Sequence, residues 1–448
     1  MEFETKFPLI FYILSKYRFK FWTVKDIEKY QDKKAKEIAK YAVEHSKFFK
    51  EHYNKYNINK FSSLPIANKK TMMGNLTDYN TLELNKDDLI NFALNVEKTR
   101  DFSKRFNGIN IGMSSGTSGN KGIVITTKEE ENYIKAMYAS RLVLPKGEKI
   151  NCAFILRIST PAFDYHQSGN KLTYINQLQP IEKTIEQLEK LNPNIVSAPP
   201  SMLKLLAKEL QEKRLKISPK LVYSYAEVLY PDVKEYLKNS FKCEVHEIYQ
   251  GSEGSYALTC RQGNLHINED MVLFELLDDR GLATKDGEPC HKLLVTDLHK
   301  KSQPIIRYEL NDIITISKEK CSCGSNFRVI KQIQGRADDM FWGLRKDTKE
   351  PQFIFQDYIG RTIISTSENI EEYQATQDSY TEIILRIQLK KGSNKEKIKE
   401  QLIQKLKKVF SKCGCIEPEI KVIFCPPLFN KGSSKLIRIK CNIGGRNE

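Results

Sequence analysis

Apolar residues follow two different spacings along this chain, and the spacing predicts where helices and strands lie. Across residues 23–50 they recur every three or four positions, which predicts a helix capped by Thr23 with Asp26 in its first turn. In the middle of the chain, helical spacing alternates with short apolar runs typical of buried strands, at residues 181–191, 195–198, 201–212 and 221–225. This alternation predicts an α/β fold with a largely parallel sheet. Two further runs predict antiparallel strands of a second layer, at residues 265–277 and 292–297.

The pattern changes again after Gly335. Residues 383–389 alternate apolar and polar positions, which predicts a half-buried strand. A helix follows, whose start carries Ser393 and Glu396 at the spacing of a capping box, and residues 420–424 predict another strand. This strand–helix–strand unit is typical of a small α+β domain.

We therefore expect two domains. A large α/β domain with more than one sheet is predicted over residues 1–337, with a helical start over residues 1–60. A small α+β domain is predicted over residues 338–448.

Residues 7–22 alternate aromatic side chains with Lys and Arg, which fits two interpretations. A helix packed on the main domain is the one we expect, and peripheral contact with a membrane surface is the alternative. The apolar run of residues 7–14 is too short to span a bilayer, and no small-residue cleavage site follows it. We expect neither a secretory signal nor a membrane span, and we expect a cytoplasmic location.

Composition narrows the class of protein. Of the 448 residues, 40% are hydrophobic and 29% are charged, so a sizeable core can form and wholesale disorder is excluded. The 72 Lys and Arg exceed the 56 Asp and Glu, giving a formal net charge of +16. Such an excess fits a nucleic acid, an anionic membrane or a polyanionic substrate, but the lysines are spread along the whole chain, so no specific nucleic-acid site is expected. The ten cysteines are too few for a disulfide scaffold in a chain of this length.

A Ser/Thr/Gly-rich stretch at residues 114–122 lies between two β-prone runs, residues 108–112 and 123–127. Its glycines let the backbone approach a ligand closely, and its hydroxyls and Lys121 are donors that suit phosphate oxygens. The stretch lacks the G-x-x-x-x-G-K-[ST] spacing of a Walker A loop, and a strand follows it instead of a helix. On composition alone, a flexible linker and a phosphate loop both fit.

Further sequence motifs show a resemblance to a known enzyme superfamily. The phosphate-loop-like sequence resembles that of the adenylate-forming ligase superfamily, and other motifs follow in that superfamily's order, at residues 249–254, 296–298, 304–312, 335–340 and 434–438. The chain is most similar to the phenylacetate–coenzyme A ligase branch, including its capsule-biosynthesis-type and deazaflavin-coenzyme-adenylylating relatives. The resemblance covers roughly residues 30–440 and implies the fold of the adenylate-forming enzymes.

The resemblance implies ATP and Mg²⁺ as cofactors and assigns roles to particular residues. Glu253 would bind the Mg²⁺ that bridges ATP oxygens, and Lys435, near the C-terminus, would complete the adenylation site. Asp312 and Arg336 would contact the ribose, and Asp338 would be the hinge of a mobile small domain. The residues implied to hold the ATP phosphates are Ser114, Ser115, Gly116, Thr117, Ser118, Gly119 and Lys121.

The adenine pocket and the acyl pocket are where this sequence departs from its relatives. Relatives carry Gly-Gly-Glu or Gly-Ala-Glu where this chain has Tyr225, Ala226 and Glu227, and the lysine of the phosphate loop also stands at a different place. Tyr225 either lines the base or narrows the acyl pocket, and His166 is either a substrate contact or a structural histidine. The nucleotide contacts that the resemblance implies here are Ala226, Glu227, Tyr249, Gln250, Gly251 and Ser252, with Tyr249 the candidate for stacking on adenine.

Cys260, His266, Cys321 and Cys323 together supply three thiolates and one imidazole. Cys₃His is an accepted ligand set for structural Zn²⁺, and some members of the branch resembled here carry a zinc knuckle at this place. The alternative is four ordinary buried residues. We expect one structural zinc ion.

The activity that the resemblance implies is the ATP-dependent adenylation of a carboxylic acid, either aromatic or small, with release of pyrophosphate. Thioester formation with coenzyme A or with the pantetheine thiol of a carrier protein would follow. One alternative is an adenylyltransferase that moves AMP onto a hydroxyl group of a cofactor-like substrate, and another is a binding protein without catalysis.

Overall fold

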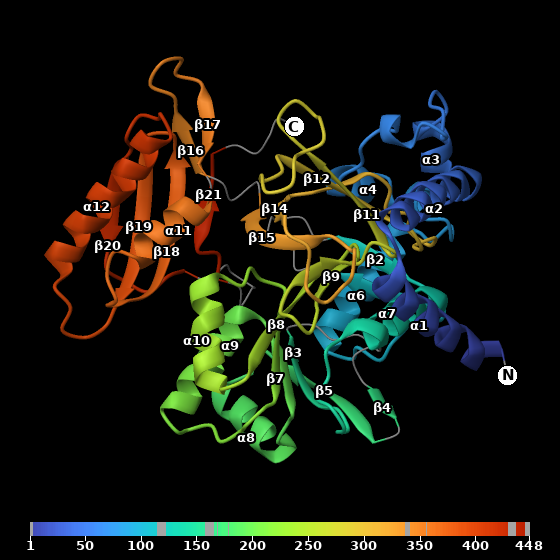
Figure 1. Ribbon diagram of the computed structural model, residues 1–448, viewed down its shortest axis with the longest axis horizontal. Helices are drawn as coiled ribbons and strands as arrows, with labels where there is room; N and C mark the ends of the chain where they lie inside the picture. Colours follow the sequence, from blue (N-terminus) through green and yellow to red (C-terminus); the bar gives the residue numbers. More distant parts are fainter. Residues whose placement is uncertain are drawn as a thin grey trace. The chain divides into compact units, whose positions relative to one another are not determined.

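The computed structural model describes residues 3–113, 122–156, 165–167, 169–177, 179–336, 341–354, 356–428 and 436–443. The chain divides into two compact units. The large unit comprises residues 1–310 and 315–331, and the small unit comprises residues 311–314 and 332–448 (Figure 1). The domain boundary predicted between residues 337 and 338 lies outside the described residues, so it stays a prediction.

A ten-stranded sheet, most of whose strands lie in the large unit, has the order β14-β15-β10-β9-β8-β7-β6-β3-β5-β4. The five adjacent strands β5, β3, β6, β7 and β8 are parallel to one another, whereas β4, β9 and β10 run antiparallel to their neighbours. The strands are β3 (Asn151–Leu156), β4 (Tyr165–Gln167), β5 (Asn170–Asn176), β6 (Ile195–Ala198), β7 (Leu221–Tyr225), β8 (Glu244–Gln250), β9 (Ser255–Thr259), β10 (Leu265–Ile267), β14 (Asp312–Ile316) and β15 (Val329–Arg336).

Three helices pack on the parallel part of this sheet: α8 (Ile181–Leu191), α9 (Pro200–Gln211) and α10 (Pro231–Phe241). Figure 1 shows them in green beside β3 and β7. Leu188, Leu206 and Leu237 of these helices are fully buried against strand residues such as Val196 and Val222. The predicted alternation of helices and buried strands is confirmed here, and so is the fold class.

Two smaller sheets complete the strands of the large unit. The β-prone runs around the Ser/Thr/Gly-rich stretch pair as an antiparallel hairpin, β1 (Asn110–Met113) with β2 (Ile123–Thr126). A three-stranded antiparallel sheet contains β11 (Val272–Leu277), β12 (Lys292–Asp297) and β13 (Tyr308–Leu310). The run at residues 265–277, predicted as one strand, is divided between β10 of the large sheet and β11 of this second sheet.

Helices precede the sheets, as predicted. Thr23 caps α2 with a reciprocal capping box to Asp26, but this helix ends at His45 because Ser46 leaves the helical conformation and caps α3 instead. The one helix predicted over residues 23–50 is therefore two. Besides α8, α9 and α10, the described helices of the large unit are α1 (Phe3–Phe21), α2 (Val24–His45), α3 (Lys47–His52), the 3₁₀ turn η1 (Phe61–Ser63), α4 (Lys69–Gly74), α5 (Leu76–Tyr79), α6 (Lys86–Thr99) and α7 (Lys128–Arg141).

The small unit contains a four-stranded sheet in the order β20-β19-β18-β21 and a separate hairpin of β16 with β17. The predicted strands and helix are present, but the N-cap of α12 is Asn394, whose side chain accepts a hydrogen bond from the Lys397 N–H, and not Ser393. Its elements are β16 (Phe341–Leu344), β17 (Pro351–Ile354), α11 (Gln356–Ile364), β18 (Ile370–Ser379), β19 (Glu382–Leu389), α12 (Lys395–Lys412), β20 (Glu419–Ile423) and β21 (Ile439–Cys441). Among the helices of the described part of the chain, none is long and apolar enough to cross a membrane.

Candidate functional site

The turn between β8 and β9 carries the motif of residues 249–254. The Gly251 N–H donates to the Gly254 carbonyl oxygen over 2.9 Å and closes this turn. A Cβ atom on Gly251 would lie 3.0 Å from Glu253 Oε2 and 3.0 Å from the Tyr256 hydroxyl oxygen, so the Glu253 carboxylate and the tyrosine occupy the space that a side chain would need. The glycine therefore lets Glu253 fold back over the turn.

Glu253 is half-buried and has two described partners. The Ser252 hydroxyl donates to its Oε2 over 2.9 Å, and the Tyr308 hydroxyl donates to its Oε1 over 3.3 Å. Two carboxylate oxygens offer about four acceptor positions. Carboxylate oxygens are ligands that Mg²⁺ uses in nucleotide sites, and this arrangement fits the predicted role of Glu253, which stays a prediction.

The hairpin that flanks the predicted phosphate loop is held against the segment that leads to Tyr308. Gln303 accepts a hydrogen bond from the Ile125 N–H over 3.0 Å and donates one to the Ile123 carbonyl over 3.0 Å. Ser302 donates to the Ile125 carbonyl over 3.2 Å. The base of the loop, the 302–308 segment and Glu253 are thereby linked through a short stretch of chain. The loop residues themselves, 114–121, lie outside the described part of the chain.

Asp297 is a buried carboxyl group close to the same turn. Its Oδ1 accepts the N–H groups of His299 and Lys300, both over 2.9 Å, and its Oδ2 would lie 3.5 Å from a Cβ atom on Gly254. Burial raises the pKa of Asp297 to about 6 and outweighs the two hydrogen bonds that lower it. The carboxyl group therefore takes up a proton more readily than an exposed aspartate.

The residues predicted to surround adenine have contacts that were not anticipated. Tyr225 is buried, stacks on Phe154 with ring centroids 5.1 Å apart, and donates its hydroxyl to the Ile155 carbonyl over 2.7 Å. Ala226 adopts a positive φ of 66°. Glu227 accepts from the N–H of Ser201 over 3.1 Å and from its hydroxyl over 2.9 Å, which places the carboxylate at the first turn of α9. The nucleotide and substrate roles of these three residues stay predictions.

Tyr249 and Gln250 end strand β8 just before the Glu253 turn. The Tyr249 ring is buried beside Tyr256, with ring centroids 5.1 Å apart. Gln250 Oε1 accepts a hydrogen bond from the Tyr138 hydroxyl over 2.6 Å, and that hydroxyl accepts one from Ser255 over 2.7 Å. These bonds connect helix α7 to the predicted nucleotide site.

The other predicted residues are distributed as follows. Asp312 begins β14 and is half-buried, and Arg336 is the last residue of β15, of which the backbone is described. His166 lies in β4, where its backbone pairs with Lys171 of β5. The predictions for Ser114, Ser115, Gly116, Thr117, Ser118, Gly119, Lys121, Asp338 and Lys435 fall outside the described residues.

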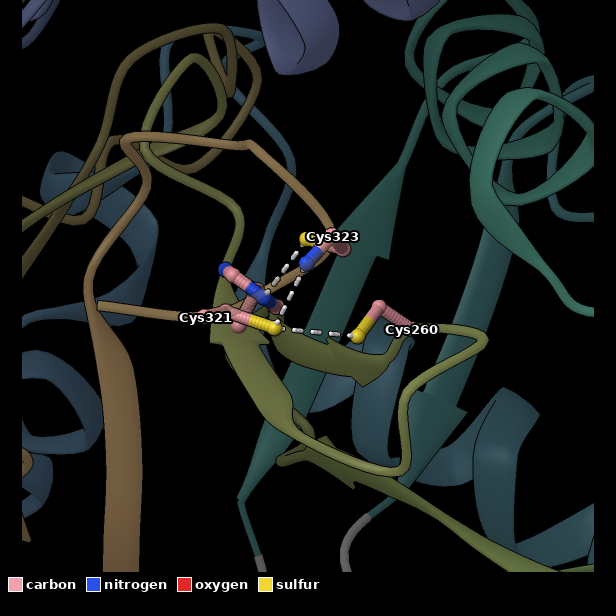
Figure 2. Close-up of side chains that lie close together, drawn as sticks. Cys260, Cys321 and Cys323 are labelled. Atoms are coloured by element: carbon pink, nitrogen blue, oxygen red, sulfur yellow. Dashed lines mark hydrogen bonds between the residues drawn. The ribbon is translucent and has the colours of Figure 1, made fainter. Parts of the chain in front are cut away.

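The structure brings Cys260, His266, Cys321 and Cys323 together in the large unit, with all four candidate ligand atoms within 4.8 Å of one another. Cys260 directly follows β9, His266 lies in β10, and the other two cysteines lie in the connection between β14 and β15. Figure 2 shows the sulfur atoms of the three cysteines facing one another. We call these four residues the Cys₃His cluster.

The distances within the Cys₃His cluster fit a tetrahedral metal site. Cys260 Sγ lies 3.7 Å from Cys321 Sγ, and Cys323 Sγ lies 3.4 Å from His266 Nε2. Zinc bonds of ~2.3 Å to sulfur and ~2.0 Å to nitrogen, set at tetrahedral angles, separate two sulfurs by about 3.8 Å and a sulfur from a nitrogen by about 3.5 Å. Both observed separations are close to these values.

Neighbouring groups also orient the cluster as they would around a metal. His266 Nδ1 lies 2.8 Å from the Phe327 carbonyl oxygen, so this nitrogen carries the proton and Nε2 is free to act as a ligand. Asn264 donates to Cys321 Sγ over 3.1 Å. Burial raises the pKa of the Cys260 thiol and raises that of Cys323 to about 12, so without a metal these two sulfurs keep their protons. A bound Zn²⁺ would reverse this, because coordination deprotonates a thiol.

A buried ion pair that no sequence pattern predicts lies next to this cluster. Arg141, at the end of α7, donates to Asp270 over 2.5 Å and to Asn268 over 2.9 Å, and both charged side chains are almost fully buried. Arg18 of α1 lies 3.9 Å from the second oxygen of Asp270. The three charges lie far apart in the sequence, and no local pattern pairs them.

The chain has relatives among proteins of known sequence. No protein-family model matches the chain. The chain is 23% identical to protein CapK of Staphylococcus aureus over 410 residues, covering 85% of this chain and 83% of CapK. It is 27% identical to a phenylacetate–coenzyme A ligase of Thermus thermophilus over 247 residues, covering 51% of this chain and 54% of that ligase.

Solved structures show the same fold. A 2-hydroxyisobutyryl-CoA ligase in its postadenylation state, in complex with an acyl-AMP, matches with a TM-score of 0.72 and 14% identity, over 95% of this chain and 92% of its own. An anthranilate CoA ligase in complex with anthranoyl-AMP matches with a TM-score of 0.52 and 14% identity, over 73% of this chain and 66% of its own. The chain therefore has the fold of these acyl-AMP-holding ligases, and its sequence is similar to that of a phenylacetate–coenzyme A ligase. The family and the enzyme class predicted from the motifs are confirmed.

Proposed function

We propose that the protein activates a carboxylic acid with MgATP, releases pyrophosphate, and passes the acyl group from the acyl-adenylate to coenzyme A. The observation that supports this best is the turn at Glu253, which lies in the fold of enzymes whose structures hold an acyl-AMP. Around this turn, Tyr308 and Asp297 come from two further motifs of the superfamily, in the order that the resemblance predicts. We propose the cytoplasm as the location, because ATP and coenzyme A are available there.

The chemistry requires negative charge to be neutralised on three phosphate groups while the substrate carboxylate attacks the α-phosphorus. In the proposal, the N–H groups and hydroxyls of residues 114–121 hold the β- and γ-phosphates, and Glu253 holds Mg²⁺. The metal ion supplies charge neutralisation on the phosphate oxygens. Asp312 accepts hydrogen bonds from the ribose hydroxyls with Arg336 beside it, and Lys435 stabilises charge at the reacting phosphorus and the carboxylate.

Asp338 is the proposed hinge of the small domain. After adenylation, rotation at this residue would remove Lys435 from the adenylate and admit the thiol. The two half-reactions would then use different positions of one small domain. Lys435 would be needed for the first half-reaction and dispensable for the second.

We propose that the Cys₃His cluster binds one structural Zn²⁺. Support comes from the complete ligand set, the two separations that fit tetrahedral bonds, and the hydrogen bond that fixes the tautomer of His266. The metal would join the turn after β9 to the connection between β14 and β15. Its function would be stability of the large unit, because all four ligand positions are filled by protein side chains.

A pyrophosphate-release screen over a panel of aromatic and small carboxylic acids tests the proposed activity. Each acid is tested with purified protein and MgATP, together with coenzyme A, a pantetheine-bearing carrier protein, a hydroxyl compound or no acceptor, and products are identified by mass spectrometry. Acid-dependent pyrophosphate release with formation of acyl-coenzyme A supports the proposal. Transfer only to the thiol of a carrier protein would overturn the assignment of coenzyme A, and formation of an AMP ester with a hydroxyl compound would overturn the ligase assignment.

A further inference from the structure

From residue 9 on, where its side chains are described, helix α1 packs on the rest of the large unit through one face. Phe11 meets Tyr133 of α7 edge to face, with ring centroids 4.3 Å apart, and Ser15 accepts a hydrogen bond from Ser140 of α7 over 2.9 Å. Further along, Phe19 meets the imidazole of His266 with ring centroids 5.3 Å apart. These contacts confirm the expectation that the N-terminal aromatic segment packs on the main domain. Figure 1 shows α1, in dark blue, beside α7 with its amino end directed away from the sheets.

The opposite face of α1 is apolar and open to solvent. It carries six of the fifteen strongly exposed large apolar side chains in the described part of the chain. They are 40–59% exposed and are Leu9, Ile10, Ile13, Leu14, Tyr17 and Phe21. We call these six residues the outer face.

The outer face forms a continuous helical stripe, because each of its residues has another member of the set three or four positions away along the chain. A soluble surface helix usually directs polar side chains to water. Helix α1 is apolar both on its outer face and on the opposite, packed face that carries Phe11 and Phe19, which we call the inner face. Contiguous exposed apolar stripes of this kind mark interaction sites. The inner face is occupied by α7 and its neighbours, so the outer face is the part of the helix that is left to be covered.

Along residues 9–25, which include the outer face, every charged side chain is positive. Lys16 and Lys20 are exposed beside it, and residues 9–25 contain four basic residues and no acidic one. The Lys20 ammonium lies 5.0 Å from the ring centroid of Phe21, so its stem runs along the apolar surface while its charge stays at the edge. Arg18, by contrast, points inward to Asp270 and is not available on this face.

We propose that the outer face of α1 attaches the protein to an anionic membrane surface, lying in the headgroup region without crossing the bilayer. An in-plane helix with an apolar stripe and flanking lysines has the chemistry that recognises anionic lipids. A second copy of the chain suits this face less well. Symmetric pairing would bring the two sets of Lys16 and Lys20 together without acidic partners, and like charges across an interface oppose association.

Vesicle flotation with the full chain tests the proposal. The protein is mixed with vesicles of phosphatidylcholine alone or of phosphatidylcholine with phosphatidylserine, at low and at physiological salt. We expect binding to the anionic vesicles that weakens as salt rises. Ile10→Gln combined with Ile13→Gln should weaken partitioning by at least about tenfold, because both side chains lie in the apolar stripe. Lys16→Gln combined with Lys20→Gln should remove most of the preference for anionic lipid.

Matched controls distinguish binding through the outer face from nonspecific hydrophobic binding to vesicles. Leu205 and Leu282 are 38% and 58% exposed and lie on α9 and in a turn, so Leu205→Gln combined with Leu282→Gln should leave vesicle binding unchanged. Thermal melting and acid-dependent pyrophosphate release should be the same in all variants without vesicles, since none of these residues belongs to the proposed catalytic site. Absence of vesicle binding, or binding that the Ile10 and Ile13 changes do not weaken, overturns the proposal. A dimer seen by light scattering that these changes dissociate, without vesicle binding, assigns the face to a second copy and also overturns it.

Discussion

Replacing Cys323 by serine should lower the stability of the large unit, if the Cys₃His cluster holds zinc. Serine keeps the size of the side chain but is a poor zinc ligand, so the ion loses one of its four bonds. Structural zinc stabilises a fold because it binds the native arrangement and not the unfolded chain. The loss of stability in the variant therefore depends on how far the substitution weakens zinc binding.

The magnitude follows from linkage and from the size of the unit. Free zinc at about 1,000 times the dissociation constant stabilises the native state by about 4.1 kcal/mol. The large unit comprises residues 1–310 and 315–331. At about 2.1 cal/mol/K per residue, the unfolding entropy of a unit of this size is about 0.7 kcal/mol/K. Loss of the metal should then lower its Tm by about 6 °C.

Differential scanning calorimetry and elemental analysis together measure this effect. Protein purified without added metal should contain one zinc per chain, and both a strong chelator and Cys323→Ser should lower the Tm by a similar amount. Cys243→Ser is the matched control, since Cys243 is also half-buried in the large unit but lies outside the cluster. Substoichiometric zinc in the wild type, together with an unchanged Tm in Cys323→Ser, would refute the reasoning.

Four further predictions concern the proposed site and its surroundings. Glu253→Gln should lower acid-dependent pyrophosphate exchange by about 100-fold without changing the Tm, and exchange at the wild-type rate would exclude the magnesium role. Lys435→Ala should lose acid-dependent pyrophosphate release yet still convert a synthetic acyl-adenylate with coenzyme A; if Lys431→Ala shows that behaviour instead, the motif is placed wrongly. The pKa of Asp297 lies at about 6 in the folded state, above its ordinary 3.8, so the folded state binds this proton more tightly and its contribution to stability falls as pH rises from 4 to 6. Asp297→Asn should therefore raise the Tm more at pH 7.5 than at pH 5, and equal shifts would contradict the assignment. Glu227→Ala should cost about 1 kcal/mol in urea unfolding, because the first turn of α9 loses its acceptor, and Glu227→Gln should recover most of that loss.

The sequence predicted those features that depend on local pattern or on side-chain chemistry. Helix α8 and strands β6 and β7 begin and end where the apolar spacing predicts, because each is buried on the face that the pattern marks. The Cys₃His cluster was predicted because few side chains bind zinc, so the ligand set is recognisable even across 63 positions of chain from Cys260 to Cys323. In both cases the residues themselves determine the structure.

Features that depend on distant partners were not predictable. The helix expected over residues 23–50 ends at Ser46, because that side chain donates to the Asp78 carbonyl and caps α3. The hydrogen bonds that Glu227 accepts from Ser201 at the start of α9 were likewise not anticipated, and the nucleotide role of Glu227 stays a prediction. Periodicity and composition describe a segment by itself, and neither contains the identity of the neighbour that a side chain will meet in the folded chain.

The inner face of α1 has a consequence for the order in which a nascent chain folds. Phe19 packs against His266 and also against Phe327, with ring centroids 5.4 Å apart in the second pair. The ribosome needs about 15 to 60 seconds to add the roughly 300 residues that separate Phe19 from Phe327. Until Phe327 has been added, Phe19 lacks one of its two aromatic partners, although α7, which covers another part of the inner face, has been synthesised much earlier. The carboxyl-terminal part of helix α1 therefore reaches its native packing only after most of the large unit has been synthesised.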